Sequence, residues 1–466
     1  MATGVPKTKW NDINLPYNIS NMPSNNIDVS LSYDGKRQEH DILATKPVGT
    51  NVLWQNNQEQ SDNRLYYGDN LPIMASLLND SSIKGKVRLV YIDPPFATKS
   101  VFKSRSQSDA YCDLLDGSRY IEFIRERLLF IRELMSEDGS IYVHLDDNMA
   151  FHIKIIMDEI FGKYNFRNWI TRKKCNPKNY TRKTYGNVSD FIIFYTKSND
   201  YVWNRPFEEW TSEHAEKEYQ YIEDGTGRKY KKVPIHAPGV RNGKTGKLWR
   251  GMTPPPGKHW QFPPDTLDDM DARGEIYWSP NRNPRRKIYL DKSQGLPIQD
   301  IWLDFRDAHN QNIKITGYPT EKNPDLLARI IEASSNSGDL VFDCFSGSGT
   351  TLSIASQLGR RWIGIDSSSE AIAITLKRFS KGLEPMGDFV NQSKSLNNNE
   401  RNENSPLTLF DWKEPSNQSD VSSSKKNVIN DFSLYVTESY NDELDVILKQ
   451  WCEWNQEDQL VRNRRI

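Results

Sequence analysis

The chain has 466 residues and a formal net charge of −1, with an isoelectric point near 6.7 and a mean hydropathy of −0.74. This balance excludes a chain-wide polycation, so any surface for nucleic acid must be local, and no apolar run reaches the roughly eighteen residues of a membrane span. The four cysteines lack the spacing of a disulfide framework or a zinc site, so we expect no metal centre and a reducing, cytoplasmic setting.

The first part of the chain combines short apolar runs with one long amphipathic stretch. Residues 1–60 are rich in Asn, Ser and Pro and predict an irregular arm. Residues 118–136 carry apolar side chains at helical spacing, from Ile121 to Leu134, and predict a helix. Other apolar runs between residues 61 and 199 predict strands at 65–67, 87–92, 140–146 and 191–195.

The composition changes at residue 200 and again after residue 386. Proline, glycine, tryptophan and basic residues dominate 200–312, which predicts a separate, irregular inserted domain. Strand and helix patterns resume over 313–386. An Asn/Ser-rich stretch at 387–427 predicts a flexible linker, and a small acidic segment follows at 428–466. We therefore predict an α/β fold with a doubly wound, mostly parallel sheet and an inserted domain.

The tetrapeptide Asp93-Pro94-Pro95-Phe96 directly follows the apolar run 87–92. Both prolines fix φ and lack an N–H, so the turn is rigid and its carbonyl oxygens stay free to accept hydrogen bonds. A carboxylate, a free carbonyl and an aromatic face in one rigid turn suit a planar ring that carries an amino group. A purely structural turn at a strand end is the alternative.

A second pattern lies between residues 340 and 366. A short apolar strand ends at Asp343, a glycine turn spans Phe345–Gly349, and a helical stretch opens at Thr350. A second strand ends at Asp366, which completes a βαβ unit of about thirty residues. Glycines let a ligand approach the backbone, and an acid after the second strand can hold ribose hydroxyls. Because the third glycine of a dinucleotide site and the lysine of a P-loop are missing, a nucleoside without phosphate fits better.

These motifs, in this order, resemble the amino-methylating DNA methyltransferases that use S-adenosylmethionine (SAM). The chain is most similar to their circularly permuted β class, which includes type III modification subunits and solitary bacterial and phage enzymes. The resemblance covers about residues 63–380 and implies a permuted Rossmann-like methyltransferase fold. It rests on five ordered blocks, Gly68-Asp69-Asn70, Asp93-Pro94-Pro95-Phe96, Ser140–Asp146, Gly317–Lys322 and Asp343–Gly349.

The resemblance implies roles for individual residues. Asp93 and the Pro94 carbonyl would accept the two N–H groups of an adenine amino group, next to Pro95, and Phe96 would stack on the base. The SAM-binding candidates are Asp69, Thr320, Lys322, Asp343, Phe345, Ser346, Gly347, Ser348, Gly349, Thr350 and Asp366. Each has a plainer alternative: Asp69 can cap a loop, Lys322 can be a surface charge, and Asp366 can cap the following helix.

Two basic groups are candidates for DNA contacts. One lies in what we expect to be a polar loop between strands of the catalytic half, where it would grip phosphates or be simply solvated: Arg172, Lys173, Lys174, Lys178, Arg182 and Lys183. The other lies in 200–312, the expected target-recognition domain: Arg241, Arg250, Arg282, Arg285 and Arg286. The tryptophans of that domain (Trp249, Trp260 and Trp278) are better explained as its core.

The function implied is site-specific transfer of a methyl group to N6 of adenine in a base flipped out of duplex DNA. An aspartate at position 93 favours adenine by family association, and N4 of cytosine is the alternative. A catalytically silent, SAM-fold DNA-binding subunit is a third reading, and RNA is a weaker alternative as substrate. A homodimer and a cognate restriction endonuclease are the protein partners that the resemblance implies; no membrane association is expected.

The chain departs from the family pattern at two positions beside the expected SAM site. Asn323 stands where a proline usually follows the lysine of the Tyr-Pro-Thr block, and Cys344 stands where the family usually has proline. Both changes lead us to ask whether SAM affinity is weakened. Methylation of cytosine C5 is disfavoured, because it needs a nucleophilic cysteine and the chain has no Pro-Cys dipeptide.

Overall fold

The computed structural model describes residues 29–55, 61–95, 101–103, 109–112, 117–175, 183–305, 321–381 and 428–438, together with Lys449 and Trp451. The described residues form two compact units. The larger unit takes in the chain up to Asn204 and from Gln299 onward, and the smaller unit is Arg205–Ile298. Each unit is described by itself.

The larger unit is built on a ten-stranded sheet with the order β1-β20-β2-β19-β18-β3-β6-β8-β7-β17 among the described residues. Its strands from β20 to β6 run parallel, whereas β8 is antiparallel to both of its neighbours. This confirms the predicted mostly parallel, doubly wound sheet. The strands are β1 (Thr50–Gln55), β2 (Arg64–Tyr67), β3 (Val87–Ile92), β6 (Met135–Leu145), β7 (Phe166–Lys173), β8 (Ser189–Thr196), β17 (Ile301–Trp302), β18 (Leu340–Asp343), β19 (Arg361–Asp366) and β20 (Ser433–Thr437).

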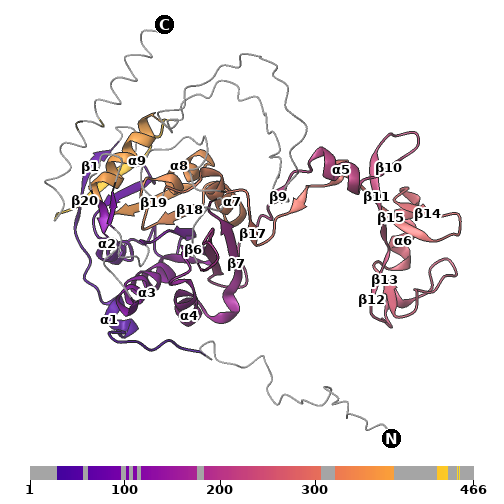
Figure 1. The fold of residues 1–466 in the computed structure, drawn as a ribbon, viewed down its shortest axis with the longest axis horizontal. Coiled ribbons are helices and arrows are strands. Elements are labelled where there is room, and N and C mark those ends of the chain that lie inside the picture. The colour runs from indigo at the N-terminus through magenta and orange to yellow at the C-terminus, as the bar shows by residue number, and fades with distance from the viewer. Residues whose placement is uncertain are drawn as a thin grey trace, which may run out of the picture. The chain divides into compact units, whose positions relative to one another are not determined.

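Helices cover both faces of this sheet (Figure 1). One face carries α1 (Glu39–Leu43), α2 (Asn70–Leu77), α3 (Gly117–Leu134) and α4 (Ala150–Phe161), and the other carries α7 (Pro324–Ser334), α8 (Thr350–Gln357) and α9 (Ser369–Lys381). Successive strand residues point to opposite faces, so Val90 and Ile92 of β3 join the core under α3, whereas Leu89 and Tyr91 point the other way. A short hairpin, β4 (Val101–Lys103) with β5 (Asp109–Cys112), completes the unit's regular elements. In the described part of the chain, no helix has the length and apolar character to cross a bilayer.

The first part of the chain corrects our expectation of an irregular arm at 1–60. Residues 39–43 form α1, and β1 pairs antiparallel with β20, which itself lies beside β2 in the large sheet. Trp451 is fully buried and its ring lies 5.5 Å from that of Trp54. The expectation was wrong because a short edge strand becomes visible only with its partner, and this partner is remote in sequence.

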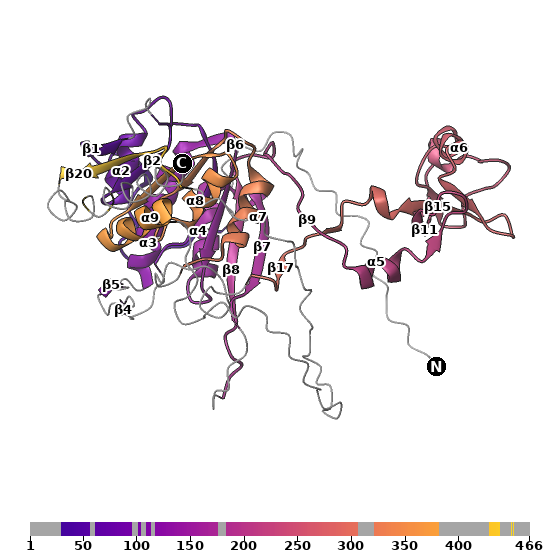
Figure 2. The same ribbon diagram turned by 90° about the horizontal axis from the view of Figure 1, so that it is seen from above.

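The smaller unit, Arg205–Ile298, lies within the segment that we expected to be a separate irregular domain. It contains a four-stranded antiparallel sheet, β10 (Tyr221–Ile222), β11 (Lys229–Pro234), β15 (Pro284–Tyr289) and β14 (Ile276–Trp278), so it is more regular than predicted. Figure 2 shows β11, β15 and α6 together. Trp249 and Trp260 are buried in its core, with Trp278 against them, as expected. The remaining elements are α5 (Ser212–Glu218), α6 (Pro264–Ala272), and the strand pairs β12 (His236–Pro238) with β13 (Lys258–Trp260) and β9 (Phe207–Glu208) with β16 (Leu296–Pro297).

Candidate active site

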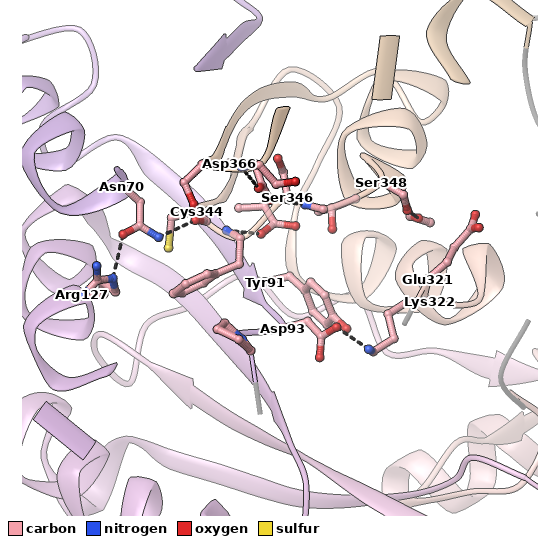
Figure 3. Close-up of a pocket in the computed structure, with 18 of the residues that line it drawn as sticks. Asn70, Tyr91, Asp93, Arg127, Glu321, Lys322, Cys344, Ser346, Ser348 and Asp366 are labelled. Atoms are coloured by element: carbon pink, nitrogen blue, oxygen red, sulfur yellow. Dashed lines mark hydrogen bonds and ion pairs between the residues drawn. The ribbon is translucent and has the colours of Figure 1, made fainter. Parts of the chain in front are cut away.

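A pocket of about 400 Å³ opens where the parallel strands β3, β18 and β19 end (Figure 3). The carboxyl ends of parallel strands meet at one edge of a sheet, and ligands of doubly wound folds bind there. Most of the predicted site residues line this pocket: Asp69, Asp93, Pro95, Lys322, Asp343, Phe345, Ser346, Gly347, Ser348, Thr350 and Asp366. Pro94 and Gly349 adjoin these residues in sequence, while Phe96 and Thr320 lie outside the described residues.

The glycine turn between β18 and α8 forms one wall of the pocket. Ser346 N–H donates to the carbonyl of Ile365 at 3.0 Å, which ties the turn to the neighbouring strand. Gly349 has a φ of +71°, and a Cβ there would lie 2.6 Å from Cγ2 of Thr375 on α9. A side chain at Gly349 would therefore strain the backbone and collide with α9. The turn needs glycine for its own packing as well as for access to a ligand.

Asp366 ends β19 and holds the glycine turn from the other side. Its carboxylate accepts hydrogen bonds from the backbone N–H of Gly347 at 2.8 Å and of Ser368 at 2.9 Å. Burial raises the pKa of this carboxyl group, and the hydrogen bonds from the two backbone N–H groups lower it by a smaller amount. Asp366 thus caps the turn before α9, as the plainer alternative had it, and also lines the pocket.

Asp343 is the most deeply buried acid of the pocket, with 2% of its surface exposed. One carboxylate oxygen accepts the N–H of Phe345 at 3.0 Å. Burial raises the pKa of Asp343 to about 7, and the negative charges of Asp93 and Asp366 add to the effect. Three carboxyl groups at one end of the sheet give a desolvated, electronegative pocket, which favours a ligand with a positive charge.

Asp93 presents one engaged and one available oxygen. Its Oδ2 forms an ion pair with the ammonium of Lys322. Its Oδ1 is buried and has no hydrogen-bond partner among the described residues. A buried acceptor without a donor is costly and is found where a ligand, an ion or a water completes the site. Asp93 therefore stands ready to accept an N–H from a bound molecule.

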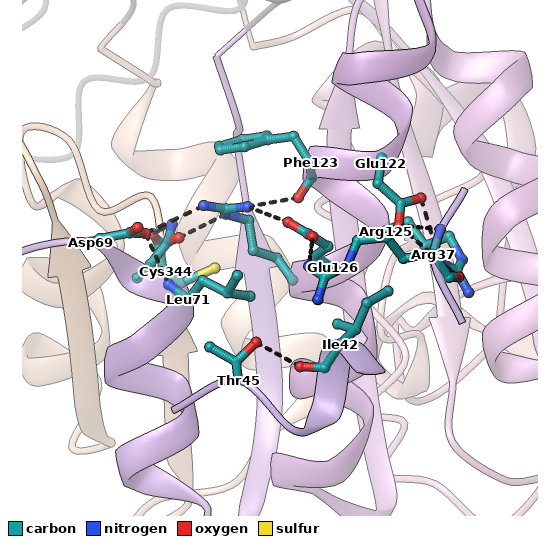
Figure 4. A network of polar contacts seen from close by, with 12 residues as sticks. Arg37, Ile42, Thr45, Asp69, Leu71, Glu122, Phe123, Arg125, Glu126 and Cys344 are labelled. Carbon is teal, nitrogen blue, oxygen red and sulfur yellow. Dashed lines mark hydrogen bonds and ion pairs between the residues drawn. The ribbon is translucent and has the colours of Figure 1, made fainter. Parts of the chain in front are cut away.

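The opposite wall rests on a buried arginine that the sequence reasoning missed, Arg127 (Figure 3). Arg127 of α3 donates to Oδ1 of Asn70 at 2.7 Å and lies 3.3 Å from Asp69, and its guanidinium sits 3.5 Å from the centre of the Phe123 ring. Figure 4 labels Asp69, Phe123 and Cys344 around this network. Asn70 in turn donates to the carbonyl of Cys344 at 2.8 Å. Asp69 also caps α2 by accepting the N–H of Leu71. The network joins three separate chain segments around the pocket.

Sequence patterns contained little signal for these supporting residues. Arg127 is a charged residue in an amphipathic helix, and such residues are usually expected on the face exposed to solvent. Glu321 lies in a block that the family resemblance had marked, but its partner Arg378 is on α9, and the two form a buried ion pair. Arg378 also donates to the hydroxyl of Ser348 at 3.1 Å. Only the fold brings these partners together.

The two departures from the family pattern have structural explanations. Asn323 caps α7, because its side-chain oxygen accepts the N–H of Asp325 at 2.8 Å and Pro324 occupies the first turn. Cys344 uses its backbone carbonyl to accept the hydrogen bond from Asn70, and a proline would offer the same carbonyl. Neither change removes a pocket carboxylate.

Two of the basic DNA-contact candidates were placed wrongly, since Arg172 and Lys173 lie on strand β7 and not in a loop. Only 1% of the surface of Arg172 is exposed, and its guanidinium forms a two-pronged ion pair with Asp190. The misplacement arose because β7 alternates polar and apolar residues, so its basic end looked like a loop. Lys173 and Lys174 are partly exposed and Lys183 is exposed. Lys178 and Arg182 lie outside the described residues.

The arginines of the smaller unit divide into two kinds. Arg241, Arg282 and Arg285 are exposed, and Arg286 lies over the ring of Phe262 at 5.3 Å. Arg250 is also exposed, but it pairs with Asp268 at 2.7 Å and with Asp271 at 2.5 Å. Its charge is therefore balanced within the unit, and we remove it and Arg172 from the candidates for DNA contact.

Comparisons with known proteins identify the family of the chain. The family model described as DNA methylase matches residues 87–377. The type II methyltransferase M.EcaI of Enterobacter cloacae is 45% identical over 415 residues, which cover 88% of this chain and 87% of that protein. The Mod subunit of the type III restriction-modification enzyme StyLTI from Salmonella typhimurium is 26% identical and covers 65% of this chain and 51% of the subunit. A solved structure of an M1.HpyAVI–SAM complex covers 68% of this chain and 98% of that chain at 16% identity, with a TM-score of 0.38.

DNA methyltransferases of this family take their methyl group from SAM. SAM is a nucleoside with a sulfonium cation and no phosphate, and the pocket offers what such a molecule needs. Five acidic residues line the pocket against two basic ones, Lys322 and Arg127, and this excess of acids favours a cation. Asp93 Oδ1 and Ser346 Oγ are buried polar atoms without a hydrogen-bond partner among the described residues. The family match spans more than half of the sequence, and the chain belongs to the N6/N4 family of DNA methylases.

Proposed function

We propose that this SAM-dependent DNA methyltransferase modifies N6 of adenine at a specific site in duplex DNA. The observation that carries the proposal is Asp93, whose Oδ1 has no hydrogen-bond partner in the described part of the chain and which lines the same pocket as the glycine turn and Asp366. Aspartate at this position favours adenine by family association, since relatives that act on cytosine N4 more often carry serine there.

The chemistry assigned to Asp93 is hydrogen-bond acceptance. The amino nitrogen of adenine is a poor nucleophile because its lone pair is delocalised into the ring. Asp93 and the Pro94 carbonyl would each accept one N–H, which shifts the nitrogen toward a tetrahedral geometry and directs its lone pair at the methyl group. SAM supplies that methyl group on a sulfonium, a good leaving group, so the protein contributes mainly positioning. Asp93 is too weak a base to deprotonate the amino group first.

The base must leave the duplex before it can reach Asp93, at a cost of a few kcal/mol. Phe96, the next aromatic residue after the double proline, is our candidate for stacking on the extruded base. The rigid Pro94-Pro95 turn would hold the Asp93 carboxylate, the Pro94 carbonyl and the Phe96 ring at fixed positions relative to one another. Pro95 lines the pocket, which supports the same assignment.

The remaining pocket residues are proposed to hold SAM. The backbone of Phe345–Gly349 would pass beneath it, Asp366 would accept from the ribose hydroxyls, and Asp69 would lie near its adenine. Lys322 and Thr320 remain our candidates for its carboxylate, because Lys322 lines the pocket and its ammonium can attract an anionic group. Asp343 would hold the turn in place through Phe345.

We propose that DNA is gripped by two groups of cations. Lys173, Lys174 and Lys183 flank the end of β7 at the same edge of the sheet as Asp93, where they would contact phosphates. The smaller unit would read the sequence with its exposed arginines, Arg241, Arg282 and Arg285, and with the partly exposed Arg286.

Partners and location follow from the restriction-modification relatives. A homodimer and a cognate endonuclease are both proposed, and we expect the protein in the bacterial cytoplasm, where the DNA is. Sedimentation of the DNA-bound protein as a monomer would count against the dimer.

Nucleoside mass spectrometry tests the proposed function. Duplex DNA of mixed sequence is incubated with the protein and SAM, digested, and searched for methylated nucleosides. N6-methyladenine is the expected product. N4-methylcytosine would keep the mechanism and change the base. A folded sample that neither binds SAM nor methylates DNA would favour a silent DNA-binding subunit and overturn the proposal.

A further inference from the structure

One face of the four-stranded sheet in the smaller unit (Figure 1) collects tyrosines and basic residues. Directly opposed residues of antiparallel strands point to the same side of a sheet, and so do residues two apart along one strand. The register therefore places these side chains on one face: Tyr221, Tyr230, Lys232, Pro234, Tyr277, Arg285, Lys287 and Tyr289. The opposite face carries Ile276 and packs on the tryptophan core of the unit.

Lys232 of β11 is held between two rings of this face. Its ammonium lies 3.6 Å from the centre of the Tyr221 ring and 3.5 Å from the centre of the Tyr277 ring. Tyr221 is 41% exposed, so the cluster reaches the surface. Aromatic rings attract an ammonium but are weak hydrogen-bond acceptors. Within the described residues Lys232 has no ion pair and no hydrogen bond, so its N–H donors remain available.

The neighbouring lysines are already paired with carboxylates. Lys287, the register partner of Lys232, forms an ion pair with Glu223 at 2.7 Å. Lys231 precedes Lys232 on β11, so it points to the other face, and it pairs with Glu218 at 3.1 Å. Lys232 differs from both, because its ammonium is held in place by rings and its charge is not balanced by an acid.

A second cation without an acidic partner lies on the same face. Arg285 is exposed and is the register partner of Tyr277, and it forms no ion pair in the described part of the chain. Burial lowers the pKa of His236, and the positive charges of Lys258 and Arg285 lower it further, so both cations lie near that ring. Positive charge that the unit does not balance favours a polyanion at this surface.

We propose that this face of the sheet meets the phosphate backbone of duplex DNA, with Lys232 as a phosphate contact and Tyr221 and Tyr277 as the residues that position it. A lysine held between two rings loses less side-chain freedom on binding than a freely rotating lysine does. Its point charge suits a phosphate, carries no sequence information and fixes the register of the duplex. Arg285, on the same face, would then be brought to the base edges. This inference rests on the proposed function, which makes duplex DNA the substrate.

The test compares two adjacent lysines on opposite faces of β11. Lys232→Ala removes the proposed contact. Lys231→Ala is the control, since Lys231 also lies near two rings, 5.5 Å from Trp210 and 5.0 Å from Tyr219, but is paired with a carboxylate. Fluorescence anisotropy gives the affinity of the full-length protein for labelled duplex DNA at a series of salt concentrations. We expect the slope of log affinity against log salt to fall by about 0.9 in Lys232→Ala and to stay unchanged in Lys231→Ala.

A lost phosphate contact has two further signatures. The advantage of the wild type over Lys232→Ala should shrink by about three- to fourfold between about 50 and 200 mM salt, because that change in slope sets the salt dependence of their ratio. The loss should also be equal on duplexes of unrelated sequence. SAM affinity, measured by calorimetry, should stay at the wild-type level, since the substitution is outside the pocket.

Two substitutions of Tyr277 test the positioning role of the rings. Tyr277→Phe keeps the ring and should bind DNA as the wild type does. Tyr277→Leu removes the ring and keeps the ammonium, so DNA affinity should fall part of the way to that of Lys232→Ala. When Tyr277→Leu is added to Lys232→Ala, we expect no further loss. Thermal unfolding identifies variants that are not folded, and Lys232→Gln replaces Lys232→Ala in that case.

An unchanged slope in Lys232→Ala, or an equal fall in Lys231→Ala, would overturn the inference, and the proposed function would stand if the wild type methylates duplex DNA. Additive losses in the double variant would contradict the positioning role of Tyr277. Failure of the wild-type protein to bind duplex DNA would overturn both proposals together.

Discussion

The acidic residues that line the pocket and two acidic residues of the smaller unit behave in opposite ways. In the pocket, burial raises the pKa of Asp343 to about 7 and raises that of Asp366 as well. In the smaller unit, hydrogen bonds from Lys287, Tyr289 and Thr226 lower the pKa of Glu223 to about 2, and a hydrogen bond from Arg228 lowers that of Asp291. Burial dominates the pKa of the carboxyl groups in the pocket, whereas hydrogen bonds from neighbouring side chains dominate it in the smaller unit.

This difference distinguishes the acids of a ligand-binding pocket from the acids that stabilise the fold of the smaller unit. A cation that enters the pocket would stabilise the ionised form of its carboxyl groups. The free energy that burial of these groups costs the folded protein would then be offset by binding of the charged ligand. In the smaller unit, Glu223 is already paired with Lys287 and Asp291 with Arg228. The arginines that remain exposed there, such as Arg282 and Arg285, are the ones available to another molecule.

The first prediction concerns the pH dependence of folding without SAM. Asp343 binds its proton more tightly in the folded state, so it costs no stability below its unfolded pKa of 3.8 and an increasing amount as pH rises through about 7. The full cost is at most about 4 kcal/mol. Asp343→Asn removes it, so the variant should gain stability relative to wild type between pH 4 and 7, as measured by urea unfolding at each pH.

Glu223→Gln is the matched variant in the other unit. Here the folded pKa is depressed, so Glu223 stabilises the protein above its unfolded pKa of 4.5 and loses that contribution as pH falls toward about 2. The wild-type advantage should therefore shrink toward low pH. The same sign of pH dependence in both variants would contradict the comparison.

The second prediction tests the glycine turn. Gly349→Ala combines a left-handed backbone with a collision against Thr375, and we expect it to destabilise the protein by about 2–5 kcal/mol and to weaken SAM binding. Gly338→Ala is the control, since Gly338 also has a positive φ of +83° but nothing lies within 4 Å of the added Cβ. Its cost should be only about 1–2 kcal/mol in thermal unfolding. Equal losses in the two variants would mean that the contact with α9 is unimportant.

The third prediction separates two arginines of the smaller unit that both have positive φ, Arg250 and Arg282. Arg250→Ala breaks the pairs with Asp268 and Asp271 and should lower the thermal midpoint while leaving DNA affinity nearly unchanged. Arg282→Ala should leave the midpoint unchanged and weaken DNA binding. If Arg282 contacts one phosphate, the slope of log affinity against log salt should fall by about 0.9. The reverse pattern would refute our division of the arginines.

The parallel sheet made much of the site predictable. Three strands were visible as apolar runs that end in an acid, and parallel strand ends must meet, so Asp93, Asp343 and Asp366 could be expected together in one pocket. The turn residues were visible because glycine and proline have backbone requirements that the sequence displays directly. Local chemistry and a simple topology were enough for this part.

The partners of buried charges could not be predicted in the same way. Arg172 and Arg127 look like surface cations in sequence, and only the fold supplies Asp190 and Asn70 as their partners. The strand β20 was missed for a related reason, because its pairing with β1 and β2 joins the two ends of the chain. Contacts between remote segments leave no local pattern.

The most direct test of the account is Asp93→Ala, with SAM affinity and methyl transfer measured on the same sample. SAM affinity is measured by calorimetry, and transfer of a labelled methyl group to duplex DNA is followed in a single turnover. The account predicts an affinity within a few-fold of wild type and a transfer rate lower by a factor of about 10² to 10³ or more. Transfer at the wild-type rate would contradict the role of Asp93, and loss of SAM binding would mean that Asp93 serves the cofactor and not the base.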